Sequence, residues 1–128
     1  MSAHIGIRNG PARFIGAYSD GVVVSNRTTW LYTAGTPGLD ESGKTPEGIE
    51  AQSRLAWENI FAILKKADMD ASHLVKVTTW LTSEDLVKDY VRVRSEFIGE
   101  NRPAFMLGTV NSLIRDDILV EIEIVAAK

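Results

Sequence analysis

The sequence predicts an α+β domain in which strands and helices form one mixed sheet with both helices on the same face. Three observations support this fold class. Two segments, residues 46–67 and 86–97, repeat apolar residues at helical spacing, and residues 74–82 and 118–125 alternate as strands do. The order along the chain is strands, helix, strand, helix and two strands. With 128 residues, we expect a single domain spanning residues 1–128.

Composition narrows the possible partners. Apolar residues make up 45% of the chain and charged residues 24%, with a net charge of −3 and no basic cluster, so neither nucleic acid nor a membrane surface is an expected partner. There is no cysteine, which excludes disulfides and thiolate chemistry. His4 and His73 are isolated and predicted to be solvated, so no metal site is expected. The N-terminus has no signal pattern, and the predicted location is cytoplasmic.

The N-terminal third predicts short strands separated by turns. Residues 5–9 are extended and end at a turn formed by Asn9, Gly10 and Pro11. Residues 22–25 and 29–34 are both rich in strand-forming side chains, and a short polar connection joins them. This pattern predicts an antiparallel hairpin, followed by a loop over residues 35–45.

The first helix is predicted to begin near Pro46, with Thr45 as its N-cap, and to run for about 20 residues. Its core stripe is partly made of small residues, which allows close packing on a sheet: Ile49, Ser53, Ala56, Ile60, Ile63 and Ala67. The second helix follows the caps at residues 82–85 and ends at Gly99. Its charged residues are expected to be solvated flanks: Lys88, Arg92 and Arg94.

The C-terminal strand carries two carboxylates on one face. Within residues 118–125, the side chains of Ile118, Val120, Ile122 and Ile124 share one face, and Glu121 and Glu123 lie on the other. Residues 104–110 form a second apolar run before it, which suggests a hairpin-like pair. The face bearing Glu121 and Trp80 is not covered by the predicted helices, so we expect it to be an association surface.

Several strings resemble the RidA family, also called YjgF/L-PSP, the reactive-intermediate deaminases. They are IGAY at residues 15–18, IEAQSRLAWENIFAIL at 49–64, LVKVTTWLT at 74–82, RPA at 102–104 and ILVEIE at 118–123. The resemblance implies a chorismate-mutase-like fold with a mixed six-stranded sheet. It also implies a homotrimer with small-molecule clefts between subunits, and hydrolysis of enamines and imines without metal or organic cofactor.

The resemblance assigns candidate site residues. Glu121 matches the water-activating glutamate, and Tyr18 matches a tyrosine that orients the substrate. The position of the arginine that clamps the substrate carboxylate holds Phe105, which has no donor. The remaining candidates are expected to line the cleft: Ala34, Gly35, Val91 and Leu107. Three of them, Ala34, Val91 and Leu107, differ from the usual family residues and are expected to make the cleft less polar. Arg115, Arg102 and Arg27 are candidates to replace the clamp, and Arg115 is kept among the ligand-binding residues.

Two hypotheses remain open. In the first, the chain is a cofactor-independent deaminase-like hydrolase with an altered, more apolar cleft between subunits. In the second, Phe105 fills the former carboxylate site, and the chain is a small-molecule-binding trimer without catalysis. Phe105 is the reason not to transfer the usual imino-acid deaminase reaction unchanged.

Overall fold

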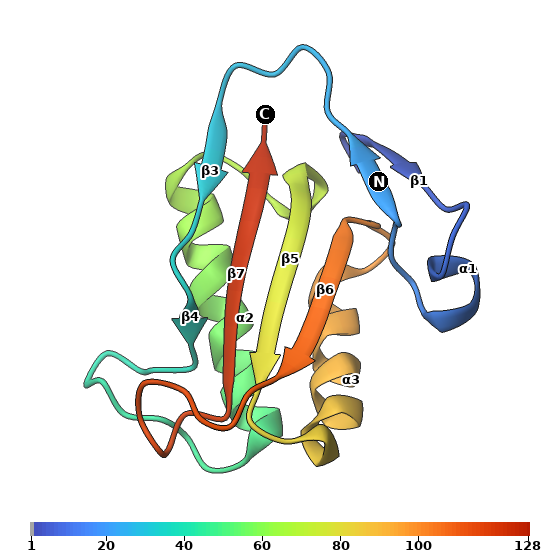
Figure 1. Ribbon diagram of the computed structural model, residues 1–128. Helices are drawn as coiled ribbons and strands as arrows, with labels where there is room; N and C mark the ends of the chain where they lie inside the picture. Colours follow the sequence, from blue (N-terminus) through green and yellow to red (C-terminus); the bar gives the residue numbers. More distant parts are fainter. Residues whose placement is uncertain (1) are drawn as a thin grey trace.

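The computed structural model describes residues 2–128, shown in Figure 1. Its elements, in chain order, are β1 (Ile5–Ile7), α1 (Ala12–Ile15), β2 (Gly21–Val23), β3 (Trp30–Tyr32), β4 (Thr36–Pro37), α2 (Ile49–Lys66), the 3-10 turn η1 (Ala71–His73), β5 (Leu74–Leu81), the 3-10 turn η2 (Glu84–Leu86), α3 (Val87–Ile98), β6 (Ala104–Thr109) and β7 (Val120–Ala127).

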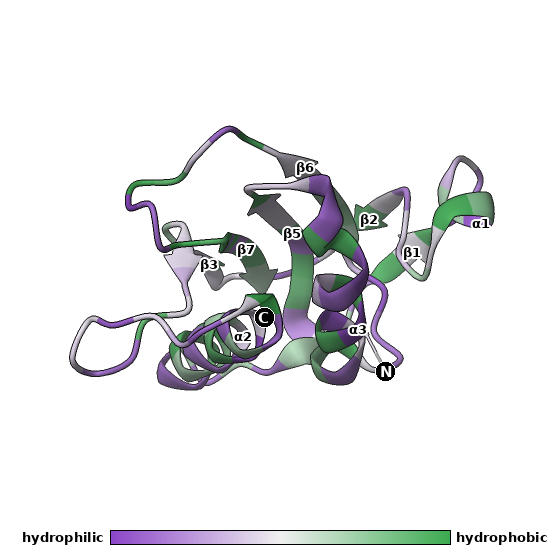
Figure 2. Cartoon of the chain, turned by 90° about the horizontal axis from the view of Figure 1, so that it is seen from below, coloured by the Kyte–Doolittle hydropathy of each residue, from purple (hydrophilic) through white to green (hydrophobic). Residues whose placement is uncertain are grey.

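A mixed sheet with both helices on one face forms the body of the molecule, which confirms the predicted fold class. The strand order is β3-β7-β5-β6, and β4 also pairs with β7. Strands β5 and β6 run parallel, and β7 is antiparallel to its three neighbours. Figure 2 shows α2 and α3 on the same side of β5, β6 and β7. No helix within residues 2–128 therefore covers the opposite face of the sheet.

The pairing of the short strands differs from the prediction. The expected hairpin of residues 22–25 and 29–34 is wrong, because β2 pairs with β1 while β3 pairs with β7. The sheet in contact with the helices has five strands rather than six, since β1 and β2 form a separate two-stranded sheet beside β6 (Figure 1). Between β2 and β3, Asn26 adopts a positive φ of 54°, and the chain crosses to the far edge of the main sheet.

Strands β6 and β7 are not the neighbouring pair that the sequence suggested, because β5 lies between them. Their faces nevertheless follow the predicted alternation. Val120, Ile122 and Ile124 are buried under the helices, and Glu123 is exposed on the opposite face. The predicted alternation is correct because a strand with one apolar face directs that face to the core, whichever strand it pairs with.

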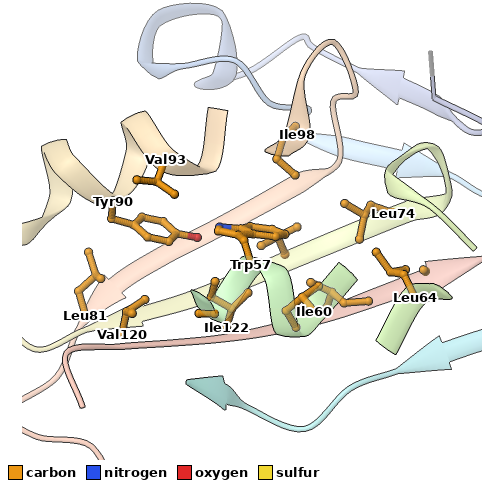
Figure 3. Packing of buried hydrophobic residues seen from close by; sticks show 14 of the residues in the cluster. Trp57, Ile60, Leu64, Leu74, Leu81, Tyr90, Val93, Ile98, Val120 and Ile122 are labelled. Carbon is orange, nitrogen blue, oxygen red and sulfur yellow. The ribbon is translucent and has the colours of Figure 1, made fainter. Parts of the chain in front are cut away.

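The core lies between α2, α3 and the sheet (Figure 3). Trp57 of α2 is fully buried, stacks on Phe97 of α3 with ring centroids 6.1 Å apart, and meets Phe61 edge-on. Tyr90 of α3 is also fully buried, and its hydroxyl lies 2.5 Å from the Thr79 hydroxyl on β5. This buried polar contact joins α3 to the central strand.

The helix ends show which cap signals were correct. Gly99 ends α3 with a φ of 59°, as predicted, and Ser83 accepts a hydrogen bond from the Asp85 amide at the turn before it. Helix α2 begins after Gly48, whose φ is 87°, and not after Thr45. Thr45 instead donates its hydroxyl to Asp117, so it ties two loops together.

His4 corrects a second prediction, because it is only 8% exposed. Its Nε2 lies 3.0 Å from the Ala127 carbonyl and 3.2 Å from the His73 carbonyl. The His73 ring is itself largely covered and accepts from the Asp70 amide in a capping box. The His4 ring therefore has hydrogen bonds near the end of β7, and the His73 ring has one within the turn η1. No helix within residues 2–128 is long and apolar enough to span a bilayer.

Candidate functional site

A pocket of about 630 Å³ opens between α3, β6 and the segment that follows α1. Four residues predicted for the site line it together, namely Tyr18, Val91, Phe105 and Leu107. The other lining residues are Ile15, Gly16, Ala17, Val87, Arg94, Ser95, Ile98, Gly99, Arg102 and Met106. Most of this lining is apolar, which agrees with the expectation drawn from Phe105 and Leu107.

The positions of Tyr18 and Phe105 follow from local structure. Phe105 and Leu107 alternate along β6 and face α3, where Val91 lies on the facing side of the helix. Ser19, which is 1% exposed, anchors the segment containing Tyr18. Its hydroxyl donates to the Arg102 carbonyl at 2.5 Å, and its amide donates to the Pro103 carbonyl. The Tyr18 and Phe105 rings then meet with centroids 5.8 Å apart.

Arg94 is a charged residue of the pocket that the sequence prediction missed. Its guanidinium carbon lies 3.9 Å from the centre of the Phe105 ring and 5.6 Å from that of Tyr90. The side chain is partly buried, and this burial lowers the pKa of its guanidinium from the usual value. It was predicted to be a solvated helix charge. The available signal was its spacing, because Arg94 falls three residues after Val91 and so shares its face of the helix.

Arg102 also lines the pocket, and one of its nitrogens already binds the protein backbone. Its Nη1 donates to the carbonyls of Gly99 and Asn101, at 2.7 and 2.8 Å. These are carbonyls at the C-terminal end of α3, where a cation also interacts favourably with the helix dipole. Arg102 therefore stabilises the connection between the end of α3 and the start of β6.

Glu121 lies in a second group of predicted residues, away from this pocket. On β7 it is in register with Pro37 of β4 and Trp80 of β5, and it is half-buried on the face that the helices leave open. Gly35 packs directly against it, since a Cβ atom there would lie 2.8 Å from the Glu121 carboxyl carbon. Ala34 precedes Gly35 and is exposed.

The two groups do not form one cleft within residues 2–128 of a single chain. Phe105 faces α3 from β6, whereas Glu121 is on the opposite face of the sheet on β7, and β5 separates the two strands. Among residues 2–128, no side chain forms an ion pair or hydrogen bond with the Glu121 carboxylate. The open face thus presents a carboxylate without a partner.

Arg115 has a partner outside both groups. It forms a two-pronged ion pair with Asp117, with Nε–Oδ1 and Nη2–Oδ2 distances of 3.0 and 2.6 Å, and it donates to the Gly43 carbonyl. The Arg115 hydrogen bonds, with that of Thr45, lower the pKa of Asp117 to about 2. Its role as a ligand-binding residue stays a prediction.

The part of the chain that the structure describes gathers no group of three His, Asp or Glu side chains suited to a metal ion.

Comparison with known proteins identifies the family. The family model described as Endoribonuclease L-PSP matches residues 10–128. A RutC family protein of Pyrococcus abyssi is 35% identical over 89% of this chain and 88% of its own length. The 2-iminobutanoate/2-iminopropanoate deaminase of Escherichia coli is 30% identical over 100% of this chain and 99% of its own.

The fold is shared with solved structures of the same group. The crystal structure of E. coli TdcF with bound serine superposes with a TM-score of 0.74 at 26% identity, covering 89% of this chain and 90% of that one. Sequence and structure thus agree over most of the chain, from the segment with Tyr18 to the strand with Glu121. The chain belongs to the RidA (YjgF/L-PSP) family.

Proposed function

We propose that this protein is a deaminase-like hydrolase of small imines or enamines, with a cleft completed by a second copy of the chain in a homotrimer. One observation carries the proposal. Within residues 2–128, the pocket of about 630 Å³ is lined by no Asp, Glu or His, while the half-buried Glu121 carboxylate on the open face has no partner. A neighbouring subunit that brings its Glu121 to the pocket supplies the missing acid–base group.

The chemistry of such a cleft is simple. Glu121 accepts a proton from water as the oxygen bonds to the imine carbon, and the proton is then delivered to the nitrogen. The hydroxyl proton then passes through Glu121 to the nitrogen as the C–N bond breaks, so the products are a carbonyl compound and ammonia. An enamine first takes a proton on carbon to become the imine. Tyr18 orients the substrate from the pocket side, and neither metal nor redox cofactor is required for the balance.

The substrate class follows from the pocket and from the relatives. The E. coli relative is named for 2-iminobutanoate and 2-iminopropanoate, both short imino acids. In this chain the lining is dominated by apolar side chains, including Val91, Phe105 and Leu107. We therefore propose a substrate with an apolar body. The family description also names an endoribonuclease, but a net charge of −3 does not favour RNA binding.

The second candidate is a trimer that binds a small molecule without turning it over. Phe105 favours it, because this ring stands where the family resemblance places the clamping arginine and packs at a tilt against Tyr18. In that case the Glu121 carboxylate has a packing or ligand-binding task only.

The deciding experiment uses 2-iminopropionate or 2-aminoacrylate generated in situ, with release of ammonia as the readout. We expect the wild type to accelerate hydrolysis and Glu121→Gln to lower the rate by about 10²–10⁴-fold, the usual contribution of a general acid or base. Glu123→Gln is the matched control, because Glu123 is exposed on the same face of β7, two residues away. A wild-type rate no faster than buffer contradicts the hydrolase and leaves the binding trimer.

Phe105→Arg is the complementary variant. If the fold and Glu121 are intact and only the clamp has changed, this substitution increases deamination of short imino acids.

A further inference from the structure

We propose that Arg94 is the anion-binding residue of the pocket, and that the ligand is a small monocarboxylate with an apolar body. The inference rests on the proposed function only in that the pocket receives the small-molecule ligand. It does not require that the ligand be turned over.

The first argument is the cost of placing a cation there. Arg94 is partly buried among Val91, Phe105 and Leu107, and no carboxylate of residues 2–128 lies within ion-pair distance of it. Its neighbour on the same helix, Arg92, is exposed and pairs with both Asp89 and Glu50. A charge removed from water without a counterion is unfavourable, whereas an incoming anion turns the same charge into a binding group.

The second argument is the position of the guanidinium. Its carbon lies 3.9 Å from the centre of the Phe105 ring, a distance typical of a cation–π contact. A guanidinium in contact with a ring can keep N–H donors free for a planar carboxylate, apart from its hydrogen bond with the Tyr90 hydroxyl. Phe105 thus acts as a support for the cation, although it has no donor of its own.

The third argument concerns the other cation of the pocket, Arg102, and the charge of the ligand. Two hydrogen bonds from its Nη1 to backbone carbonyls hold Arg102 at the C-terminal end of α3, whereas Arg94 lies over the Phe105 ring. A single guanidinium matches one negative charge, which favours a monocarboxylate over a phosphate dianion. The surrounding lining includes Ile98 and Leu107, which favour an alkyl body rather than a polar one.

The test is calorimetric titration with 2-oxobutanoate, a stable oxo analogue of a short imino acid, and with butanone, which has a methyl group in place of the carboxylate. We expect Arg94→Gln to weaken 2-oxobutanoate binding by about tenfold to a hundredfold and to leave butanone binding unchanged. Arg94→Lys recovers part of the affinity, because it keeps the charge but not the fork.

Arg92→Gln is the matched control, since it removes the same charge from the same helix on the exposed side. Its affinity for 2-oxobutanoate is expected within about twofold of wild type, because exposed charges contribute little. An unchanged thermal midpoint and intact butanone binding show that Arg94→Gln is folded.

Three outcomes overturn the inference. In the first, Arg94→Gln and Arg92→Gln bind 2-oxobutanoate with equal affinity. In the second, Arg102→Gln weakens 2-oxobutanoate binding and Arg94→Gln does not. In the third, the wild type binds 2-oxobutanoate no more tightly than butanone. The proposed function fails separately, when Glu121→Gln leaves the deamination rate unchanged. Because binding is measured without turnover, Glu121→Gln should keep the Arg94-dependent affinity in either case.

Discussion

Phe105 contacts both an aromatic ring and a cation in the pocket. Its ring cannot donate a hydrogen bond, but it packs at a tilt against Tyr18 and lies beneath the Arg94 guanidinium. A smaller aliphatic residue at this position would leave Arg94 without an aromatic support. Phe105 on β6 and Arg94 on α3 therefore set the polarity of the pocket together.

Gly35 keeps the Glu121 carboxylate in place. A Cβ at Gly35 would lie 2.8 Å from both the carboxyl carbon and Oε1 of Glu121, so Gly35→Ala must displace the carboxylate. We expect deamination to fall by up to about a hundredfold, since displacement by about 1 Å has that effect in active sites. The unfolding midpoint should change little, because the flexible side chain can move.

The control for this prediction is Gly21→Ala, where an added Cβ meets nothing within 4 Å. Equal rates for the two variants would show that the carboxylate has no role in turnover. The measurement is the rate of ammonia release at saturating substrate.

Asp117 gives a prediction about pH. Hydrogen bonds from Arg115 and Thr45 lower its pKa in the folded protein to about 2, from 3.8. The stability that this shift contributes is fully present above the pKa of the unfolded state. It is lost as the pH falls through the pKa of the folded state. We expect an NMR titration of this carboxyl group to show a midpoint near 2, and Arg115→Gln to raise it more than Thr45→Ala does. An unchanged midpoint in Arg115→Gln contradicts this assignment.

At the scale of elements, Gln52 connects α2 to the segment that enters β7. It is 3% exposed, donates to the carbonyls of Pro46 and Asp117, and accepts from the Leu119 amide at 2.9 Å. Gln52→Leu leaves these backbone groups without a partner, at a cost of about 1–3 kcal/mol for each buried group.

We therefore expect urea unfolding to show that Gln52→Leu lowers the free energy of unfolding by at least about 2 kcal/mol. Glu58→Gln, an exposed position on the same helix, should stay within about 0.5 kcal/mol of wild type. A loss of similar size in both variants would mean that α2 is sensitive to any change, and that the Gln52 hydrogen bonds have no special weight.

The sequence predicted the long elements and missed the pairing of the short ones, for a physical reason. Helices α2 and α3 and strands β5 and β7 have enough residues for a period to be visible. Strands β1, β2 and β3 have three residues each, so nothing local specifies their partners. Helix α2 was placed too early, because Pro46 and Thr45 resemble a helix start that Gly48 provides instead.

The candidate site was predictable only in part. Tyr18, Val91, Phe105 and Leu107 meet in the pocket as the family strings implied. Arg94 was not found, since a charged residue on an amphipathic helix is usually solvated and only its place beside Val91 distinguishes it. The alternation of residues 118–125 already placed Glu121 on the sheet face that is turned away from the helices. The sequence does not show what covers that face.

At the scale of the whole molecule, the open face of the sheet leads to a prediction about assembly. It carries Trp30 and Tyr32, 44% and 71% exposed, whose rings stack on each other, and Met106 at 45%. We expect light scattering to give three times the 14.1 kDa chain mass. Tyr32→Asp should dissociate the assembly and lower deamination, because it places a charge on the apolar surface.

Lys65→Asp is the control, since Lys65 is exposed on α2 in the layer of helices. We expect the mass of the Lys65→Asp assembly and its rate of deamination to match those of the wild type. A monomeric wild type that still releases ammonia would contradict a cleft shared between subunits.

Strand β7 pairs with β3, β4 and β5, and the Ile124 amide donates to a hydroxyl of Thr33, 91 residues away along the chain. Contacts of such long range slow folding, because the entropy of closing a large loop is lost before any pairing compensates for it. The edge strand with Trp30 and Tyr32 cannot dock until β7 is in place. During that interval the two rings are free to meet other chains, so refolding yield should fall as protein concentration rises.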